Sequence, residues 1–403
     1  MTTDLLCESV KTLPEVKKNY KIRIETQEVE RLLKEGKKRS QIVALLGAQP
    51  SAIDYHLKKI HHKANSIKVP EKPKRDYNKL IDWRVYNEGL VKRGEILLDL
   101  EVFKDWDEEL RRMNEGKVGA PYEYPESFID FILQIKTEFK IGYRQAEGIS
   151  RKLAVFVPQI KRAPDYTTIQ TRFEKMLIET KVYQTHEEST TVKDSTGIKT
   201  SNRGEYKTLK YDGKKKKEYI KLHIEVEIQT GELLGLEVTR STVVDSAVAE
   251  DLTVQSGQSG LVKKSYMDAG YDSKQVYGMH LEKGIEPIIK PSRLGTIENI
   301  QKRHDRLKKK KERHRLTRDE EGDLGRCKVL LEYFKNPELW KKETGYGLRW
   351  HGEGWFSAFK RILGEEVFSR KYENIVKELK FKGNIMNLFK FVSRGYRKEK
   401  AIA

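Results

Sequence analysis

A run of alternating residues between positions 187 and 242 restricts the fold of this chain more than any other feature. Val, Ile, Thr and Tyr alternate there with charged residues, the period-two pattern of strands that bury one face. Gly213 and Thr230-Gly231 mark hairpin turns within the run. The pattern predicts antiparallel strands, which fall in segments 187–194, 206–211, 218–229 and 233–242.

The pattern changes after this run. Residues 246–257 suit a helix, 264–267 a short strand, 272–282 a second helix and 286–289 a further strand. Three antiparallel strands followed by helix, strand, helix and strand predict an α/β domain with a mixed five-stranded sheet flanked by helices. That order matches the ribonuclease H-like fold.

Residues 26–63 predict three short helices, with Gly47 in the turn before a third helix that starts at Pro50. A buried stripe on the third helix leaves five side chains facing outward, namely Tyr55, His56, Lys58, Lys59 and His62. A short helix, a glycine turn and a basic helix form the helix-turn-helix pattern, whose second helix enters a major groove of DNA. The alternative is a three-helix core with a solvated basic face.

Charge indicates the partner. Lys and Arg number 80 against 61 Asp and Glu, a net charge of +19, and a compact body with that excess favours a polyanion such as nucleic acid. Two cysteines exclude a disulfide scaffold and a cysteine-rich zinc module. No signal peptide is evident, and no apolar run approaches the roughly 18 residues that span a bilayer. We therefore expect a cytoplasmic protein without a membrane partner.

Residues 302–318 concentrate the charge, with ten Lys or Arg against two acids. That excess is more than a solvated face needs, so the stretch, as a helix or a loop, predicts contact with a phosphate backbone. The lysines at its centre are Lys308, Lys309, Lys310 and Lys311.

Two aspartates follow predicted strands. Asp194 ends the first, and Asp268 ends the strand at 264–267. These two strands are neighbours in a ribonuclease H-like sheet, so both carboxylates should lie together at one sheet edge and repel each other. Divalent metal would hold such a pair ionised, and hard oxygen ligands suit Mg²⁺ or Mn²⁺.

A third acid is expected from a late helix. On that helix Glu353, Phe356 and Lys360 fall at i, i+3 and i+7, so Phe356 can anchor the helix while Glu353 and Lys360 border one surface. Glu353 would bind metal and Lys360 a phosphate beside it. A solvated surface lysine is the alternative for Lys360.

Four residues of this segment carry a resemblance to a known family. Two residues separate Tyr346 from Arg349, three separate Arg349 from Glu353, and six separate Glu353 from Lys360. This spacing resembles the Tyr-Arg-Glu-Lys signature of prokaryotic insertion-sequence transposases of the DDE class. The sequences DSTG at Asp194 and DAGYDS at 268–273 resemble the first and second acid motifs of that family. The likeness extends over about residues 80–392.

The resemblance implies a function. Asp194, Asp268 and Glu353 would form a triad holding two metal ions, Mg²⁺ with Mn²⁺ as a substitute, for cleavage and joining of phosphodiesters. Tyr346, Arg349 and Lys360 would contact DNA near the transposon end. The enzyme would bind the terminal inverted repeats of its element as a homodimer or larger assembly, since two ends must be held together, and would be associated with the nucleoid of a prokaryotic cell.

Other acids and other functions compete with this interpretation. Asp272 and Asp245 each precede a predicted helix and are expected to be helix caps. Trp350 and Trp355 could stack on an extruded base or pack in the core. A domesticated, non-catalytic DNA-binding protein and a related nuclease of the same fold are the alternative functions.

The expected organisation has five parts. They are an arm with a helix-turn-helix domain, a linker, a helical region, a ribonuclease H-like catalytic domain with a basic insertion at about 293–340, and a basic tail. Their respective bounds are 1–66, 67–80, 81–185, 186–392 and 393–403.

Overall fold

A computed structural model describes residues 25–37, 39–64, 82–183, 186–200, 219–292 and 295–402. The chain divides into two compact units, Met1–Ile81 and Asp82–Ala403, which we describe separately. The linker predicted at 67–80 and the strand predicted at 206–211, with its turn at Gly213, lie outside the described residues.

The first unit holds the three predicted helices, α1 (Thr26–Lys34), α2 (Arg39–Leu46) and α3 (Pro50–Ala64). Their small core consists of Val29, Leu32, Ile42 and Ile53. Gly47 takes a positive φ of 56° in the turn before α3, a conformation that a side chain would disfavour. Arg39 joins α2 to α3 through two hydrogen bonds of 2.6 Å to Asp54.

The second unit begins with helices. They are α5 (Trp83–Leu97), η1 (Leu100–Phe103), α6 (Trp106–Asn114), α7 (Glu126–Glu138), α8 (Tyr143–Leu153) and α9 (Tyr166–Lys175). The apolar side of α7 fills a core of their own, with Phe128 and Ile129 fully buried. Asp165 caps α9 by accepting a hydrogen bond of 2.6 Å from the backbone N–H of Thr168.

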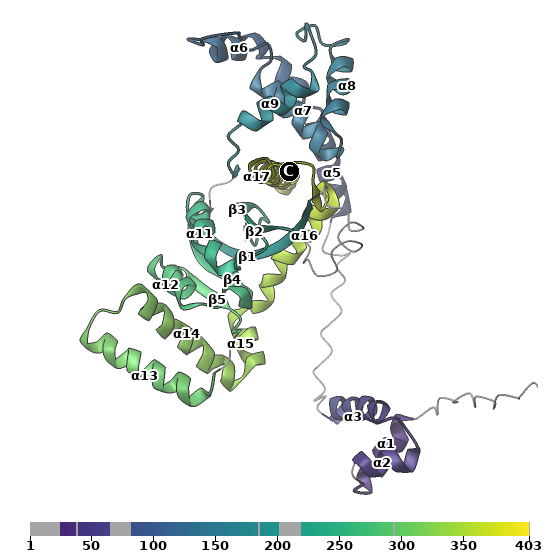
Figure 1. Cartoon of the computed structure of the whole chain (residues 1–403), viewed down its shortest axis with the longest axis vertical. Helices are drawn as coiled ribbons and strands as arrows, with labels where there is room; N and C mark the ends of the chain where they lie inside the picture. Colours follow the sequence, from purple (N-terminus) through teal and green to yellow (C-terminus); the bar gives the residue numbers. More distant parts are fainter. Residues whose placement is uncertain are drawn as a thin grey trace, which may run out of the picture. The chain divides into compact units, whose positions relative to one another are not determined.

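The central sheet has the strand order β3-β2-β1-β4-β5 (Figure 1). The strands β1 (His186–Thr200), β2 (Ile220–Glu227) and β3 (Leu233–Arg240) are antiparallel, whereas β4 (Gly260–Met267) and β5 (Glu286–Ile289) run parallel to β1. A short β6 (Glu366–Val367) pairs with the far end of β1. The mixed five-stranded sheet predicted from the sequence is confirmed.

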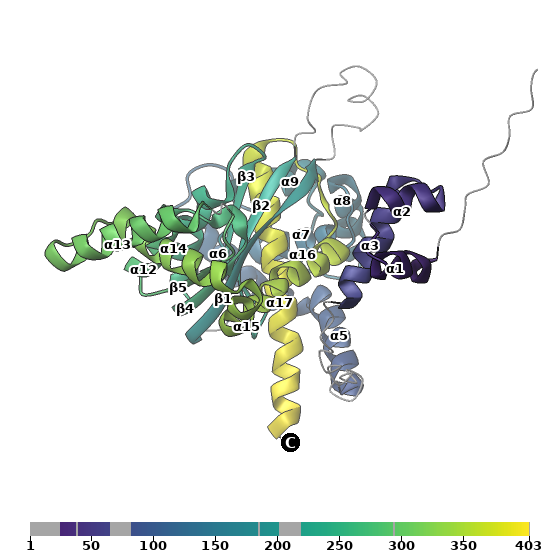
Figure 2. The ribbon, with the colours of Figure 1, turned by 90° about the horizontal axis from the view of Figure 1, so that it is seen from below.

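Helices cover both faces of this sheet (Figures 1 and 2). Tyr266 joins the core formed with α16 (Trp350–Leu363) and α17 (Tyr372–Ile402). Its neighbour Met267 joins the opposite core, formed with α11 (Ala249–Gly257) and α12 (Lys274–Glu282). Successive residues of a strand face opposite sides, so one strand serves two layers. A short turn, η2 (Asp245–Val248), comes directly before α11, and another, η3 (Ala269–Tyr271), lies between β4 and α12.

The basic insertion is helical. It contains α13 (Ile297–Arg313), α14 (Arg318–Lys335), α15 (Pro337–Thr344) and η4 (Tyr346–Arg349). The α14 helix lies directly on α12, because a Cβ on Gly322 would come within 1.9 Å of the Lys274 carbonyl oxygen. The hairpin of α13 and α14 extends from the body of the unit (Figure 2). The basic stretch at 302–318 is therefore helix for most of its length.

The last helix, α17, continues to Ile402 through the segment predicted to be a tail. It packs along α5, from nearly the other end of the unit, and the Arg93 guanidinium donates a hydrogen bond of 2.8 Å to the Ser393 hydroxyl. Within the described ranges, no helix combines the length and the apolar character that a bilayer crossing requires.

Candidate active site

The two predicted aspartates lie on neighbouring strands. Lys193 of β1 is in register with Met267, the last residue of β4, so Asp194 and Asp268 follow side by side. The prediction that the first strand ends at Asp194 is wrong, because β1 continues to Thr200 through its pairing with β2. Only β4 ends there, and Asp268 accepts a hydrogen bond of 2.9 Å from the Gly270 N–H in the turn that follows.

Burial and like charge raise the pKa values of both aspartates. Burial has the largest effect on Asp194, and the charges of Asp268 and Glu353 add to it, although the Ser195 N–H and Arg349 oppose them. The pKa of Asp194 rises to about 6 as a result. Burial also raises the pKa of Asp268, and the like charge of Asp245 adds to this effect. A divalent cation would relieve this crowding.

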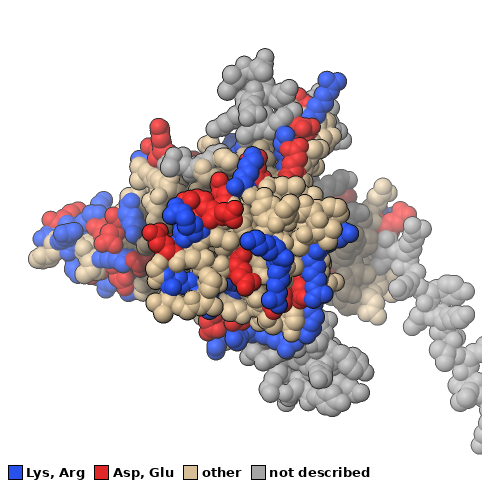
Figure 3. Space-filling view, turned by 90° about the horizontal axis from the view of Figure 1, so that it is seen from above, with Lys and Arg blue, Asp and Glu red and all other residues tan. Residues whose placement is uncertain are grey.

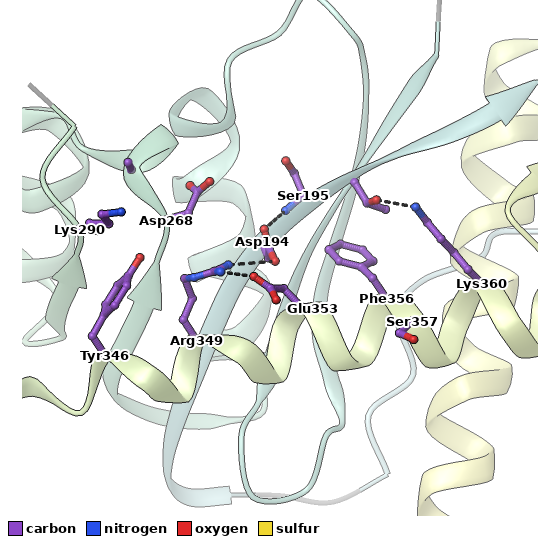
Figure 4. Close-up of a pocket in the computed structure, with 12 residues that line it drawn as sticks. Asp194, Ser195, Asp268, Lys290, Tyr346, Arg349, Glu353, Phe356, Ser357 and Lys360 are labelled. Atoms are coloured by element: carbon purple, nitrogen blue, oxygen red, sulfur yellow. Dashed lines mark hydrogen bonds and ion pairs between the residues drawn. The ribbon is translucent and has the colours of Figure 1, made fainter. Parts of the chain in front are cut away.

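The helix α16 brings Glu353 to the same place. A Cβ on Gly352 would approach within 3.0 Å of the Asp194 Cβ, so this glycine lets the helix lie against β1. Phe356 anchors the helix in the core, as predicted, and is 6% exposed. The Arg349 guanidinium lies 3.5 Å from the Asp194 carboxylate and also pairs with Glu353 (Figure 4).

Tyr346 and Lys360 line the same cleft, whose volume is about 710 Å³. The Tyr346 hydroxyl lies 3.3 Å from the carbonyl oxygen of Met267, and burial raises its pKa to about 12. Lys360 donates a hydrogen bond of 2.8 Å to the Thr196 hydroxyl. Its ammonium is therefore directed into the cleft (Figure 4). The structure thus brings together in one cleft the three predicted metal-binding acids and the three residues predicted to contact DNA beside them.

Carboxylate oxygens from three elements are the donors that Mg²⁺ and Mn²⁺ prefer, and the composition of the site fits such ions. Among the residues that the structure describes, no three potential ligands already converge on one point. Instead the Arg349 guanidinium lies between Asp194 and Glu353 and supplies the positive charge there. A metal ion held by these carboxylates would take over that charge from Arg349.

The other two predicted contact groups lie elsewhere. On α3, Tyr55 is exposed, but the half-buried His56 ring is hydrogen-bonded to the Thr26 hydroxyl at 2.9 Å and does not point freely outward as predicted. The side chains of Lys58 and Lys59 lie outside the described part of the chain.

The four lysines of α13 that were predicted to contact DNA, Lys308 to Lys311, are all exposed. Lys310 pairs with Glu320 on α14, and Lys311 with Glu321 at 2.9 Å. The face of the hairpin in Figure 3 accordingly mixes blue and red side chains. Lys308 and Lys309 form no ion pair with the described residues.

Two acids that the sequence assigned to helix caps have other roles. Ser273, and not Asp272, caps α12, because the chain enters that helix one residue later. Asp272 instead receives two hydrogen bonds, of 2.7 and 2.8 Å, from Arg326. Asp245 makes no side-chain cap either and pairs with Lys221 of β2.

Asp245 is a neighbour of the site that sequence reasoning missed. One oxygen of Asp245 and one of Asp268 each lie 3.1 Å from the point where a Cβ on Gly270 would be. The two carboxylates therefore approach each other across a residue without a side chain. The alternation along β2 places Lys221 on the opposite face from Leu222. It does not identify Asp245 as the partner of Lys221, so the sequence held no signal for this contact. Trp355 packs in the core, whereas Trp350 is 59% exposed.

Comparison with known proteins gives family matches and distant structural ones. A family model described as transposase DDE domain matches residues 185–387, and a second with the same description matches 91–203. A simian T-cell lymphotropic virus intasome in complex with PP2A regulatory subunit B56 gamma is 12% identical, with 51% of this chain and 68% of that chain covered and a TM-score of 0.18. A Drosophila P element transposase strand transfer complex is 11% identical, with 75% and 86% covered and a TM-score of 0.28.

The first family match spans half of the chain and includes the positions of all three acids of the cleft. The sheet order and the cleft described above agree with that match. The chain therefore belongs to the DDE transposase family and is a DDE-type DNA transposase.

Proposed function

We propose that this transposase is of the prokaryotic insertion-sequence type and acts on the terminal inverted repeats of its own element. The observation that carries the proposal is the convergence of Asp194, Asp268 and Glu353 in one cleft with Tyr346, Arg349 and Lys360. The two aspartates come from the edge of the sheet. The other four residues come from one continuous stretch, η4 with α16, at the spacing of the Tyr-Arg-Glu-Lys signature.

The three carboxylates would hold two divalent ions, Mg²⁺ or Mn²⁺. Such ions, when bound, activate the attacking oxygen and stabilise the leaving oxygen of an in-line displacement at phosphorus. The positions of the two aspartates are fixed before any ion arrives, because a backbone N–H holds one oxygen of each. Glu353 is 61% exposed at its side chain and, among the described residues, pairs with Arg349 alone, so it is the acid free to adjust.

The basic and hydroxyl groups of the cleft would hold the DNA strand. Arg349, once released from the carboxylates, presents a planar donor pair suited to a phosphate. Lys360 needs only to exchange the Thr196 hydroxyl for a phosphate oxygen. The Tyr346 hydroxyl stays protonated at neutral pH, because its pKa is about 12, and can donate a hydrogen bond to the strand.

The first unit would recognise the transposon end. Its α3 carries the exposed Tyr55 together with Lys58 and Lys59 in the position of a recognition helix. Two ends must be held together for joining, so the active form would be a homodimer or a larger assembly. Exposed lysines of α13, led by Lys308 and Lys309, would add contacts to the phosphate backbone.

A cleavage assay tests this function. DNA from the borders of the gene is incubated with wild type and with Glu353→Ala, in Mg²⁺, in Mn²⁺ and in chelator. Glu343→Ala, an exposed glutamate on α15, is the matched control. We expect metal-dependent cuts at the border with wild type and Glu343→Ala, and none with Glu353→Ala. Equal cutting by Glu353→Ala would refute the triad, and border binding without cuts in any variant would favour a non-catalytic DNA-binding protein.

A further inference from the structure

We propose that DNA flanking the scissile phosphate leaves the active-site cleft along a second groove, which we call the α8 groove. It is defined by Tyr143, Arg144, Tyr166, Phe368, Arg370 and Lys371. The inference rests on the proposed function and adds to it the path of the bound duplex. It concerns a surface outside the acidic cleft, built from the helical region and the loop before α17.

The α8 groove is a well-formed hollow of about 700 Å³. The start of α8 and one side of α9, from Tyr166 to Glu174, form one wall. The segment that leads from Phe368 into the first turn of α17 forms the other. Gln145 and Gln170 also line it, so hydrogen-bond donors accompany the cations. Such a mixture of positive charge, amides and aromatic rings is typical of surfaces that bind a nucleic-acid backbone.

The cations of the groove are largely unneutralised. Arg144 and Arg370 are exposed and form no ion pair with any carboxylate in the described ranges. Lys371 has Glu174 at 3.6 Å, a long ion pair, and Glu174 is also bonded to Asn374. Lys308 to Lys311 of α13 differ, because two of these four are paired with acids of α14. Two of the three groove cations therefore carry charge that no described acid offsets, and Glu174 is the one acid among the lining residues.

The aromatic rings are held in place by cations. The Arg144 guanidinium lies 4.9 Å from the centre of the Tyr166 ring. The ammonium of Lys136, a residue only 6% exposed, lies 4.6 Å from the centre of the Tyr143 ring and 5.4 Å from that of Phe368. These contacts fix the groove wall before a ligand binds, which lowers the entropy cost of binding.

The α8 groove and the active-site cleft share no lining residue, and α16 is the element that leads from the cleft toward the groove. Lys360 lies near the C-terminal end of that helix, and α16 ends at Leu363, before Gly364. The Lys140 side chain packs 3.6 Å from the position of a Cβ on Gly364, two residues before Gly142 begins the groove wall. The helices agree with this path, since α16 packs on α7 and α7 on α8.

A duplex is the occupant that these observations favour. It carries one charge per about 1.7 Å of its axis, so a strand bound at Lys360 must continue past neighbouring surface, and cations lie on this side. An acidic protein segment is the competing occupant, because it would also satisfy Arg144 and Arg370. It has no reason to lie next to the cleft that holds the scissile phosphate, and the experiment below separates the two.

Salt titration of DNA binding by the full chain tests the proposal. The probe is a 40-base-pair duplex of arbitrary sequence, and the groove variant is Arg144→Ala/Arg370→Ala. The control is Arg111→Ala/Arg112→Ala, which removes two exposed arginines of α6 that are paired with Glu108 and should leave the slope unchanged. The slope of log affinity against log salt is about 0.9 per phosphate contact, so the groove variant should lose close to two units of slope. Arg144→Lys/Arg370→Lys should restore most of it, which separates lost charge from a folding defect.

The outcomes are distinct. A smaller slope in the groove variant, restored by lysine, supports the proposal. A slope equal to that of wild type overturns it, and border cutting by wild type in the same preparation would leave the proposed function intact. A groove variant that binds DNA normally but loses affinity for polyglutamate would also overturn the proposal, in favour of an acidic protein segment.

Discussion

The buried pair of Lys193 and Glu225 should be a main determinant of the stability of the catalytic sheet. Lys193 of β1 and Glu225 of β2 are 0% exposed, and their charged groups lie 2.8 Å apart. The Lys193 ammonium also donates a hydrogen bond of 2.9 Å to the Ser265 hydroxyl of β4. One side chain thus joins three strands immediately before Asp194, on the opposite face of the sheet.

Lys193→Met leaves the Glu225 carboxylate buried without its cation. Removing one partner of a buried ion pair costs about 3–5 kcal/mol, whereas an exposed pair contributes about 0–1 kcal/mol. Burial lowers the pKa of Lys193, although Glu225 opposes the change. Urea denaturation monitored by circular dichroism measures the loss.

Two further variants test the reasoning. Lys264→Met breaks an exposed pair with Glu286 in the same sheet and should cost less than about 1 kcal/mol. Lys193→Met/Glu225→Leu removes both charges and should recover most of the loss, because no buried charge is left alone. The explanation is refuted if Lys193→Met is no more destabilising than Lys264→Met, or if the double variant is as unstable as the single one.

Three shorter predictions concern the site and its support. Asp194 has a pKa of about 6 in the folded protein, above its value in the unfolded chain. Its ionisation therefore destabilises the fold as pH rises from about 4 through 6. Without metal, Asp194→Asn should unfold at a higher urea concentration than wild type at pH 8, but not at pH 4. Asp245→Asn should lower the Mn²⁺ affinity measured by calorimetry several-fold, while Asp251→Asn, on α11, leaves it unchanged. Gly322→Ala should lower the melting temperature by several degrees, since its Cβ would overlap the Lys274 carbonyl, whereas Gly325→Ala meets only a flexible leucine and should cost less.

The alternating segments predicted the sheet, because alternation is a local periodicity. The strand and helix patterns also predicted that Asp194, Asp268 and Glu353 would meet, and they line one cleft. The spacing of Tyr346, Arg349, Glu353 and Lys360 also placed four residues on one continuous stretch that the structure brings to Asp194. Local patterns serve well where one strand or helix carries the whole signal.

Pairings between distant segments could not be predicted. Asp245 was expected to be a cap because its neighbours suggest one, and its true partner Lys221 lies 24 residues earlier. The lysines of α13 were expected to be free for phosphate because the acids that pair with Lys310 and Lys311 belong to the next helix. Charge along the chain therefore overstated the basic surface of α13 and gave no signal for the α8 groove.

The place of α17 in the fold has a consequence for the order in which the chain acquires structure. Leu379 and Phe389 of this helix fill the core against strands β2 and β3, and Asn387 bonds both the Leu233 N–H and its carbonyl. A nascent chain on the ribosome lacks these partners until residues beyond 390 emerge. Until then the apolar face of the sheet that α17 covers stays exposed to solvent. Helices α1–α3 need only their own 39 residues, 26–64, and can fold long before. During synthesis the first unit would thus be folded while the active-site cleft is still incomplete.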